Sequence, residues 1–164
     1  MPDAKIIYLL RNPVDRAWAQ AGMFFGKHRQ SGLSSVNDTA IREFLTKEAV
    51  LLNSNYTQVL AQWERVYQPS QLFVGFFDEL VAQPERLLGR VLDFLEVGPA
   101  PTQLLSKARE KRNIGQYPEM PPNIADHLTR IFYDSIVDIH RRFDNIYTQQ
   151  WLSSADRHMS QHRN

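Results

Sequence analysis

The sequence predicts an α/β fold with few parallel strands and many helices, and three observations support this class. Two short apolar runs, at residues 6–10 and 71–77, have the length of strands rather than of helices. The second run carries apolar side chains on both faces, as the strands of a covered parallel sheet do. Most of the remaining chain has apolar residues at helical spacing.

Six helices are expected where apolar residues recur every three or four positions. Asn37 or Asp38 suits the cap of one helix, and prolines suit the first turn of two others. An irregular stretch is expected over residues 98–122, and a turn is expected to begin at residues 78–80. The expected helices are 14–27, 37–45, 56–67, 84–95, 103–109 and 122–143.

Length and composition narrow the class of protein further. The 164 residues suit one domain, predicted over residues 1–151, with a polar, disordered tail at 152–164. The net charge of +1 argues against nucleic acid or an anionic membrane as a partner. No apolar run approaches the roughly 20 residues of a membrane span. The absence of cysteine excludes disulfides and zinc–thiolate sites, and we expect a cytoplasmic protein.

The most informative segment runs from Lys5 to Trp18, where an apolar strand leads into a helix. Arg11 follows the strand, Pro13 suits a first helical turn because its missing N–H needs no partner there, and Asp15 lies near the positive end of the helix dipole. A cation and the first amides of a helix at the end of a buried strand favour phosphate binding. The alternative is that Arg11 caps the strand and pairs with a carboxylate.

This segment resembles the 3'-phosphate-binding motif of sulfotransferases that use 3'-phosphoadenosine 5'-phosphosulfate (PAPS), especially the bacterial and heparan-sulfate-type branch. That motif reads as an apolar strand followed by Arg-x-Pro-x-x-Arg-x-x-Ser. Arg11, Pro13 and Arg16 match it in register, but the serine position is Ala19. This chain therefore has both arginines of the motif but lacks the hydroxyl donor of its serine. Losing one hydrogen bond to a charged group costs about 1.5–3 kcal/mol, which weakens a site without abolishing it.

A second basic cluster lies before residues 113–118. In the family, a basic loop at about this place, followed by a pattern like Tyr-x-x-Met-Pro and a final helix, closes over the nucleotide. Residues 112–120 resemble that pattern, so Arg112 is the first choice for a phosphate contact and Lys111 the second. The alternative for each is a solvated basic loop. The basic residues of the cluster are Lys107, Arg109, Lys111 and Arg112.

The resemblance implies a partial P-loop-NTPase-like sulfotransferase fold that moves a sulfuryl group from PAPS to an acceptor hydroxyl or amine. The acceptor, a carbohydrate or a small molecule, cannot be read from the sequence. The nucleotide-binding residues that the resemblance implies are Arg11, Arg16, Ala19, Lys111 and Arg112.

The glycine- and threonine-bearing loop that holds the 5'-phosphosulfate in the family has no counterpart here, because the seven glycines are scattered. No catalytic base is assigned, since the histidines resemble no active-site arrangement. The resemblance covers nearly all of this chain but only the latter half or so of the family domain. We therefore expect a fold without the N-terminal phosphate-loop unit and a chain that is weakly active or inactive by itself.

Two strands cannot form a covered sheet. Either a second copy of the chain or a missing N-terminal segment is expected to cover the sheet edges, or the edges stay exposed. A second hypothesis for the function is a non-catalytic helical interaction module derived from the same fold. A nucleotide kinase is the poorer third, because no Walker-type glycine–lysine loop is present.

Overall fold

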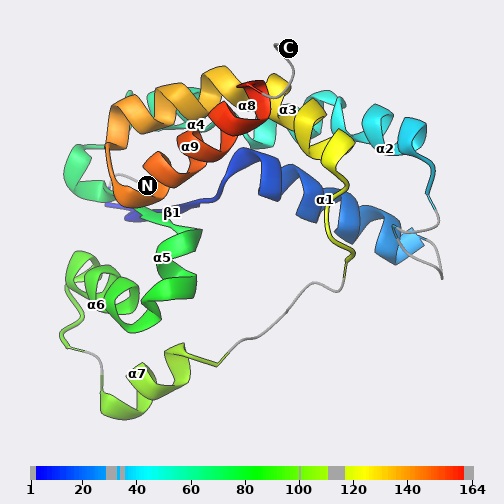
Figure 1. The fold of residues 1–164 in the computed structure, drawn as a ribbon. Helices are drawn as coiled ribbons and strands as arrows, with labels where there is room; N and C mark the ends of the chain where they lie inside the picture. Colours follow the sequence, from blue (N-terminus) through cyan, green and yellow to red (C-terminus); the bar gives the residue numbers. More distant parts are fainter. Residues whose placement is uncertain (1–2, 29–32, 34–35, 100, 111–116, 161–164) are drawn as a thin grey trace. The chain divides into compact units, whose positions relative to one another are not determined.

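The computed structural model describes residues 3–28, 33, 36–99, 101–110 and 117–160 of the chain. This part is mostly helical and contains a small parallel sheet, which confirms the predicted class (Figure 1). None of its helices combines the length and the apolar character that a bilayer crossing needs. The elements, in chain order, are β1 (Ile6–Leu10), α1 (Pro13–His28), α2 (Asp38–Leu45), α3 (Glu48–Asn53), α4 (Tyr56–Trp63), η2 (Pro69–Gln71), β2 (Leu72–Phe76), α5 (Phe77–Ala82), α6 (Pro84–Leu95), α7 (Thr102–Ala108), α8 (Pro122–Phe143) and α9 (Ile146–Ser160).

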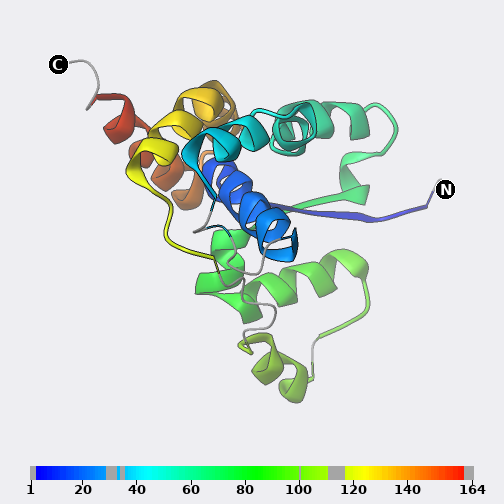
Figure 2. The same ribbon diagram turned by 90° about the vertical axis from the view of Figure 1, so that its right-hand side faces the viewer.

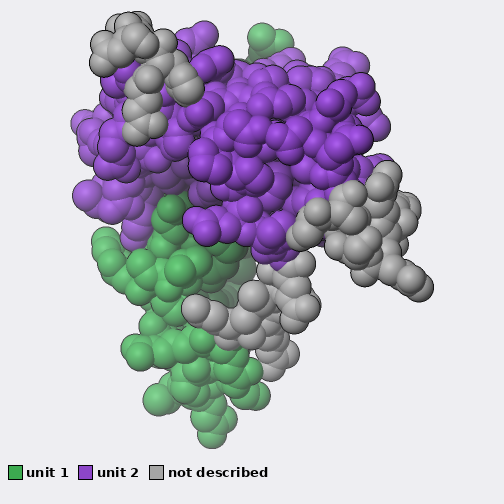
Figure 3. All heavy atoms as spheres, turned by 45° about the vertical axis from the view of Figure 1, so that its right-hand side comes forward, with its two compact units in different colours: residues 1–11, 59–114 green, residues 12–58, 115–164 purple. Residues whose placement is uncertain are grey.

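The chain divides into two compact units, and each is built from two separate segments (Figure 3). Unit 1 comprises residues 1–11 and 59–114, and unit 2 comprises residues 12–58 and 115–164. The expected domain over residues 1–151 takes in parts of both units and stays a prediction.

The sheet of unit 1 consists of β1 and β2, which run parallel and lie side by side in Figure 2. Ile6 is opposite Leu72, and Leu10 is opposite Phe76. Both strands therefore end at the same edge of the sheet. Arg11 follows β1 and begins the connection to α1, whereas Phe77 follows β2 directly as the first residue of α5.

Helices α5 and α6 cover β2, but one side of β1 stays open. Ile7 and Leu9 are 41% and 40% exposed, whereas Leu10 is buried. An apolar groove of about 410 Å³ lies along this side. The covered sheet that the apolar runs predicted is therefore incomplete within the described residues. The groove is lined by Ile7, Leu9, Leu80, Pro84, Leu87, Leu88, Val91, Leu104, Lys107 and Ala108.

Residues 78–80, expected as the start of a turn, belong to helix α5 instead. Asp78 and Glu79 occupy its first turn, where carboxylates interact favourably with the helix dipole. Glu79 is 3% exposed, and its Oε2 accepts a hydrogen bond of 2.6 Å from Arg90 Nη1. This ion pair, in which the carboxylate is buried and the arginine is half-exposed, ties α5 to α6 within unit 1.

Unit 2 is built around α8, which contacts both α1 and α9. The predicted apolar stripe of this helix is confirmed as its buried side. Asn37 caps α2 as expected, because its Oδ1 accepts from the backbone N–H of Ala40 at 2.8 Å. The buried apolar residues of α8 are Ile124, Leu128, Phe132, Ile136 and Ile139.

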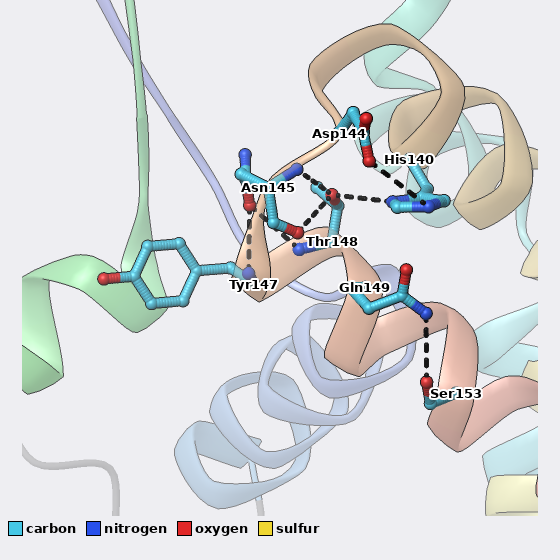
Figure 4. A network of polar contacts seen from close by, with 7 residues as sticks. All are labelled: His140, Asp144, Asn145, Tyr147, Thr148, Gln149 and Ser153. Atoms are coloured by element: carbon cyan, nitrogen blue, oxygen red, sulfur yellow. Dashed lines mark hydrogen bonds and ion pairs between the residues drawn. The ribbon is translucent and has the colours of Figure 1, made fainter.

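A polar network at the turn between α8 and α9 fixes the start of the last helix (Figure 4). Asn145 Oδ1 accepts from the backbone N–H groups of Tyr147 at 2.9 Å and Thr148 at 3.1 Å. In return, Thr148 Oγ1 accepts from the backbone N–H of Asn145 at 3.2 Å and lies 3.1 Å from His140 Nδ1. This reciprocal cap satisfies backbone donors that the helix itself leaves without partners.

The disordered tail expected from residue 152 is wrong over residues 152–160, which continue α9. Trp151 and Ala155 lie one turn apart and are both buried, with Ala155 only 3% exposed. The burial of these two side chains and the cap at Asn145 thus stabilise a helix whose composition is mainly polar.

Candidate functional site

Arg11 directly follows β1 at the carboxyl edge of the sheet in unit 1. Its Cζ atom lies 4.7 Å from the centroid of the Phe77 ring, which follows β2 at the same edge. A guanidinium over an aromatic face is attracted by the ring quadrupole, so this contact helps to orient the Arg11 side chain. The sequence analysis did not single out Phe77, although its place after the second apolar run mirrors the place of Arg11 after the first.

The start of α1 in unit 2 is capped by a residue that the sequence analysis missed. Asn12 Oδ1 accepts from the backbone N–H of Val14 at 3.0 Å, and its carbonyl oxygen accepts from the backbone N–H of Arg16 at 2.9 Å. Pro13 lies in the first helical turn as predicted, and the helix begins at this residue, one position before the expected start. An asparagine before a proline was the available signal, because this pair is common where helices begin.

Arg16 is a half-buried cation one turn into α1. Its Nη1 donates to Gln20 Oε1 at 3.0 Å and to Ser54 Oγ at 3.3 Å. Both acceptors are neutral, and Arg16 has no carboxylate partner in the part of the chain that the structure describes. A half-buried guanidinium without a compensating carboxylate favours an anionic ligand. Ser54 could not be linked to Arg16 by any local pattern, because 38 positions separate them.

Ala19 lies three residues after Arg16 and is half-buried, so both residues are on one side of α1. Ala19 therefore stands on α1 where the motif that this segment resembles has its serine, and its side chain is only a methyl group. That Ala19 lies at the nucleotide stays a prediction.

Lys111 and Arg112 lie outside the described residues, but the segment that follows them is anchored on α1 within unit 2. The carbonyl oxygen of Pro118 accepts a hydrogen bond of 3.0 Å from Trp18 Nε1. Tyr117 packs so closely on Gly22 that a Cβ atom there would lie 2.7 Å from the ring carbon Cγ. The Tyr-x-x-Met-Pro segment is thus held against the same helix that carries Arg16.

The other two basic residues of the second cluster differ in their surroundings within unit 1. Arg109 Nε forms an ion pair with Glu85 Oε1, which lowers the pKa of that carboxyl below its usual range. Lys107 lines the apolar groove and is exposed. The charge of Arg109 is therefore already compensated.

The three histidines of unit 2 whose side chains the structure describes do not supply an evident base. His140 is held at the α8–α9 turn, and His158 Nδ1 lies 2.7 Å from Asp126 Oδ1. His127 is partly buried, its Nε2 has no hydrogen-bond partner among the described residues, and burial together with the charges of Arg42 and Arg130 lowers its pKa. Among all the residues that the structure describes, no three His, Cys, Asp or Glu side chains lie close enough together to hold a metal ion.

Comparison with known proteins identifies the family. The model of the sulfotransferase family matches residues 1–100 of this chain. The chain belongs to the sulfotransferase family. This family match confirms the resemblance that residues 5–18 indicated, and the two curated relatives below agree with it.

The relatives of this sulfotransferase-family chain include the heparan sulfate glucosamine 3-O-sulfotransferase 6 of mouse and of human. Each is 34% identical over 98 residues, which is 57% of this chain and 28% of the relative. The aligned part thus spans about a quarter of the length of either relative. A crystal structure of a sulfotransferase from Alicyclobacillus acidocaldarius matches with a TM-score of 0.61 and 21% identity, over 92% of this chain and 58% of that one. This structural likeness shows that the fold is a sulfotransferase fold.

Proposed function

We propose that this chain carries the part of a PAPS-dependent sulfotransferase that binds the 3'-phosphate of the nucleotide. In the reaction, an acceptor hydroxyl or amine takes the sulfuryl group and loses a proton, and adenosine 3',5'-bisphosphate is released. Family membership supports the reaction class. The names of the curated relatives favour a carbohydrate acceptor. The base that removes the proton is not assigned, and the expected cytoplasmic location and self-association stay predictions.

The observation that carries this proposal is the placement of Arg11, stacked on Phe77 where two parallel strands end. The carboxyl ends of parallel strands are where α/β folds bind their ligands. In the proposal, the Arg11 guanidinium donates to the 3'-phosphate. An arginine suits this role because its planar donors match phosphate oxygens in pairs.

Further residues are proposed to support the nucleotide. Arg16 has the uncompensated charge described above, and the amides at the start of α1 lie at the positive end of the helix dipole. Ala19 is proposed to lie beside the phosphate without donating to it. Lys111 and Arg112 are proposed as the cations of the closing loop on the strength of the family pattern.

Calorimetric binding of adenosine 3',5'-bisphosphate to the whole chain tests the proposal. Arg11→Ala should weaken binding about ten- to a hundredfold, because a charged hydrogen bond contributes about 1.5–3 kcal/mol. Arg86→Ala is the matched control: Arg86 is an exposed arginine of unit 1 that bonds to Gln83, and its removal should leave affinity unchanged. Adenosine 5'-monophosphate, which lacks the 3'-phosphate, should bind weakly and equally to all three proteins. Equal binding of the bisphosphate by wild type and Arg11→Ala would remove the nucleotide site and favour the non-catalytic module.

A gain of affinity offers an independent check. Ala19→Ser restores the hydroxyl donor of the family motif on the side of α1 that carries Arg16. It should tighten binding of the bisphosphate by about tenfold or more and leave the affinity for adenosine 5'-monophosphate unchanged. The matched control is Ala61→Ser on the exposed side of α4, which should change neither affinity.

A further inference from the structure

The Arg16 side chain is held at one of its nitrogen atoms only. Nη1 donates to Gln20 Oε1 at 3.0 Å and to Ser54 Oγ at 3.3 Å, and these bonds use both N–H groups of that nitrogen. The N–H groups of Nε and Nη2 have no acceptor among the described residues. They form one edge of the planar guanidinium, and such an edge can bind two oxygen atoms of a phosphate side by side.

The two acceptors are fixed on different helices of unit 2. Gln20 lies four positions after Arg16, so the two side chains are neighbours on the surface of α1. Ser54 caps the end of α3, where its backbone N–H donates to the Leu51 carbonyl oxygen at 3.0 Å. The side chain of Ser54 is fully buried and therefore has little freedom to move. Arg16 is thus attached both to its own helix and to a rigid point on a second helix.

The chemistry of these acceptors distinguishes Arg16 from the paired arginines of unit 1. Arg90 and Arg109 each form an ion pair with a glutamate. The acceptors of Arg16 are instead an amide oxygen and a hydroxyl oxygen, which orient the guanidinium but carry no charge that would compensate it. An uncompensated, half-buried cation costs desolvation free energy, so this arrangement is a poor choice for stability alone. It suits a cation that awaits an anionic partner.

We propose that Gln20 and Ser54 are positioning residues that hold the Arg16 guanidinium for the 3'-phosphate of the nucleotide. Both act through Arg16 and do not touch the nucleotide themselves. A side chain that is ordered in advance loses less conformational entropy when the ligand binds. This inference rests on the proposed function and deepens it, because the motif around Arg11 and Arg16 assigns no role to position 20 or 54.

Calorimetric titration of the whole chain with adenosine 3',5'-bisphosphate tests the attachment first. Gln20→Met removes one acceptor and leaves the charge of Arg16 in place, so binding should weaken about two- to tenfold, the cost of ordering one long side chain. Ser54→Ala should weaken binding to a similar extent. Neither change should weaken binding further when it is added to Arg16→Met, because a positioning residue has no effect without the group that it positions.

Gln20→Glu tests the need for a neutral acceptor. This variant keeps the attachment of Arg16 but adds a carboxylate that compensates its charge and repels the phosphate. Binding of the bisphosphate should weaken about tenfold or more, while the melting temperature should stay equal or rise, since an ion pair at this spacing stabilises a helix. A merely structural role for Gln20 predicts the same melting temperature with unchanged affinity. Gln150, exposed in α9, is the matched control, and both Gln150→Met and Gln150→Glu should bind as the wild type does.

The outcomes separate this inference from the proposed function. Bisphosphate binding that both Gln20 variants weaken, with no further loss from Gln20→Met in the Arg16→Met variant, supports the positioning role. If Arg11→Ala weakens binding but both Gln20 variants bind as the wild type does, the nucleotide site stands and the inference is overturned. An equal loss from Gln20→Met with and without Arg16 also overturns it, because Gln20 then acts independently. Absence of bisphosphate binding by the wild type removes the proposed function and this inference together.

Discussion

The two units bury their apolar side chains to different extents. In unit 2, Leu128 and Ile139 of α8 are completely buried between neighbouring helices. In unit 1, Leu9 of the sheet and Leu104 of α7 stay 40% and 43% exposed along the apolar groove. Since hydrophobic stabilisation scales with the apolar area removed from water, unit 2 holds the larger share of the stability of the chain. Arg11 therefore lies in the unit whose apolar side chains are less completely buried.

The largest test of this comparison removes the same side chain from each unit. Leu128→Ala should lower the free energy of unfolding by about 3–5 kcal/mol, because it leaves a cavity in a closed core. Leu9→Ala should lower it by about 1 kcal/mol, since much of that side chain is already in water. Urea denaturation measures both. Leu52→Ala, at an exposed position of unit 2, is the control and should resemble Leu9→Ala. Similar losses at positions 9 and 128 would contradict the difference between the units.

The next test concerns the buried carboxylate of Glu79 in unit 1. Arg90→Met removes the partner of Glu79 and leaves a carboxylate that is almost inaccessible to water. The free energy of unfolding should fall by about 2–3 kcal/mol at neutral pH. Adding Glu79→Gln to Arg90→Met should recover part of that loss, because the buried group is then neutral. A loss that is unchanged in the double variant would mean that Arg90 acts only by covering the Phe73 ring.

A smaller effect compares one glycine from each unit. In Gly22→Ala, the new methyl group would meet the Cγ and Cβ atoms of Tyr117 at 2.7 and 2.8 Å, next to the backbone, so we expect a loss of about 1–3 kcal/mol. In Gly75→Ala, the nearest atom is the end of the half-exposed Leu9 side chain, which can rotate away. That loss should stay below about 1 kcal/mol.

Gly26→Ala serves as the control for this pair, since no atom lies within 4 Å of a Cβ at that position of α1. It should raise stability by about 0.5–1 kcal/mol through helix propensity alone. If Gly75→Ala proved more destabilising than Gly22→Ala, the view of unit 1 as the more adaptable unit would have to be abandoned.

The smallest predicted effect is the pH dependence of unit 2. The pKa of His127 is lowered in the folded chain, so the unfolded chain binds a proton first as the pH falls. Stability should therefore decrease as the pH falls from about 7 through the ordinary histidine pKa of about 6.5. His127→Gln should show a smaller decrease between pH 7.5 and 5.0 in thermal melts. A steeper decrease in the variant would reverse the sign of this prediction.

The sequence predicted those elements whose signal is local and strong. The stripe from Ile124 to Phe143 and the Asn37 cap are local signals, because period and capping chemistry are written within a few residues. Helix α9 was missed because Trp151 and Ala155 are too few to give a visible stripe. Its stability depends on the Asn145 cap and on contact with α8. Helix α3 has only six residues and no side-chain cap, so it left no clear pattern.

The candidate site divides in the same way. The motif around Arg11 and Arg16 was visible because the family spaces these residues within one short segment. Ser54 and Phe77, which hold the two arginines, were not visible because only the fold brings them near.

The hydrogen bond from Trp18 to the Pro118 carbonyl has a consequence for biosynthesis. Its partners are 100 residues apart, and each unit interleaves an early and a late piece of chain. A ribosome adds about 5–20 residues per second, so the indole waits roughly 5–20 seconds for its acceptor to be made. During that interval the side of the first helix that later packs against α8 is exposed on the nascent polypeptide. A chaperone that binds apolar segments can bind this helix until its partner is made.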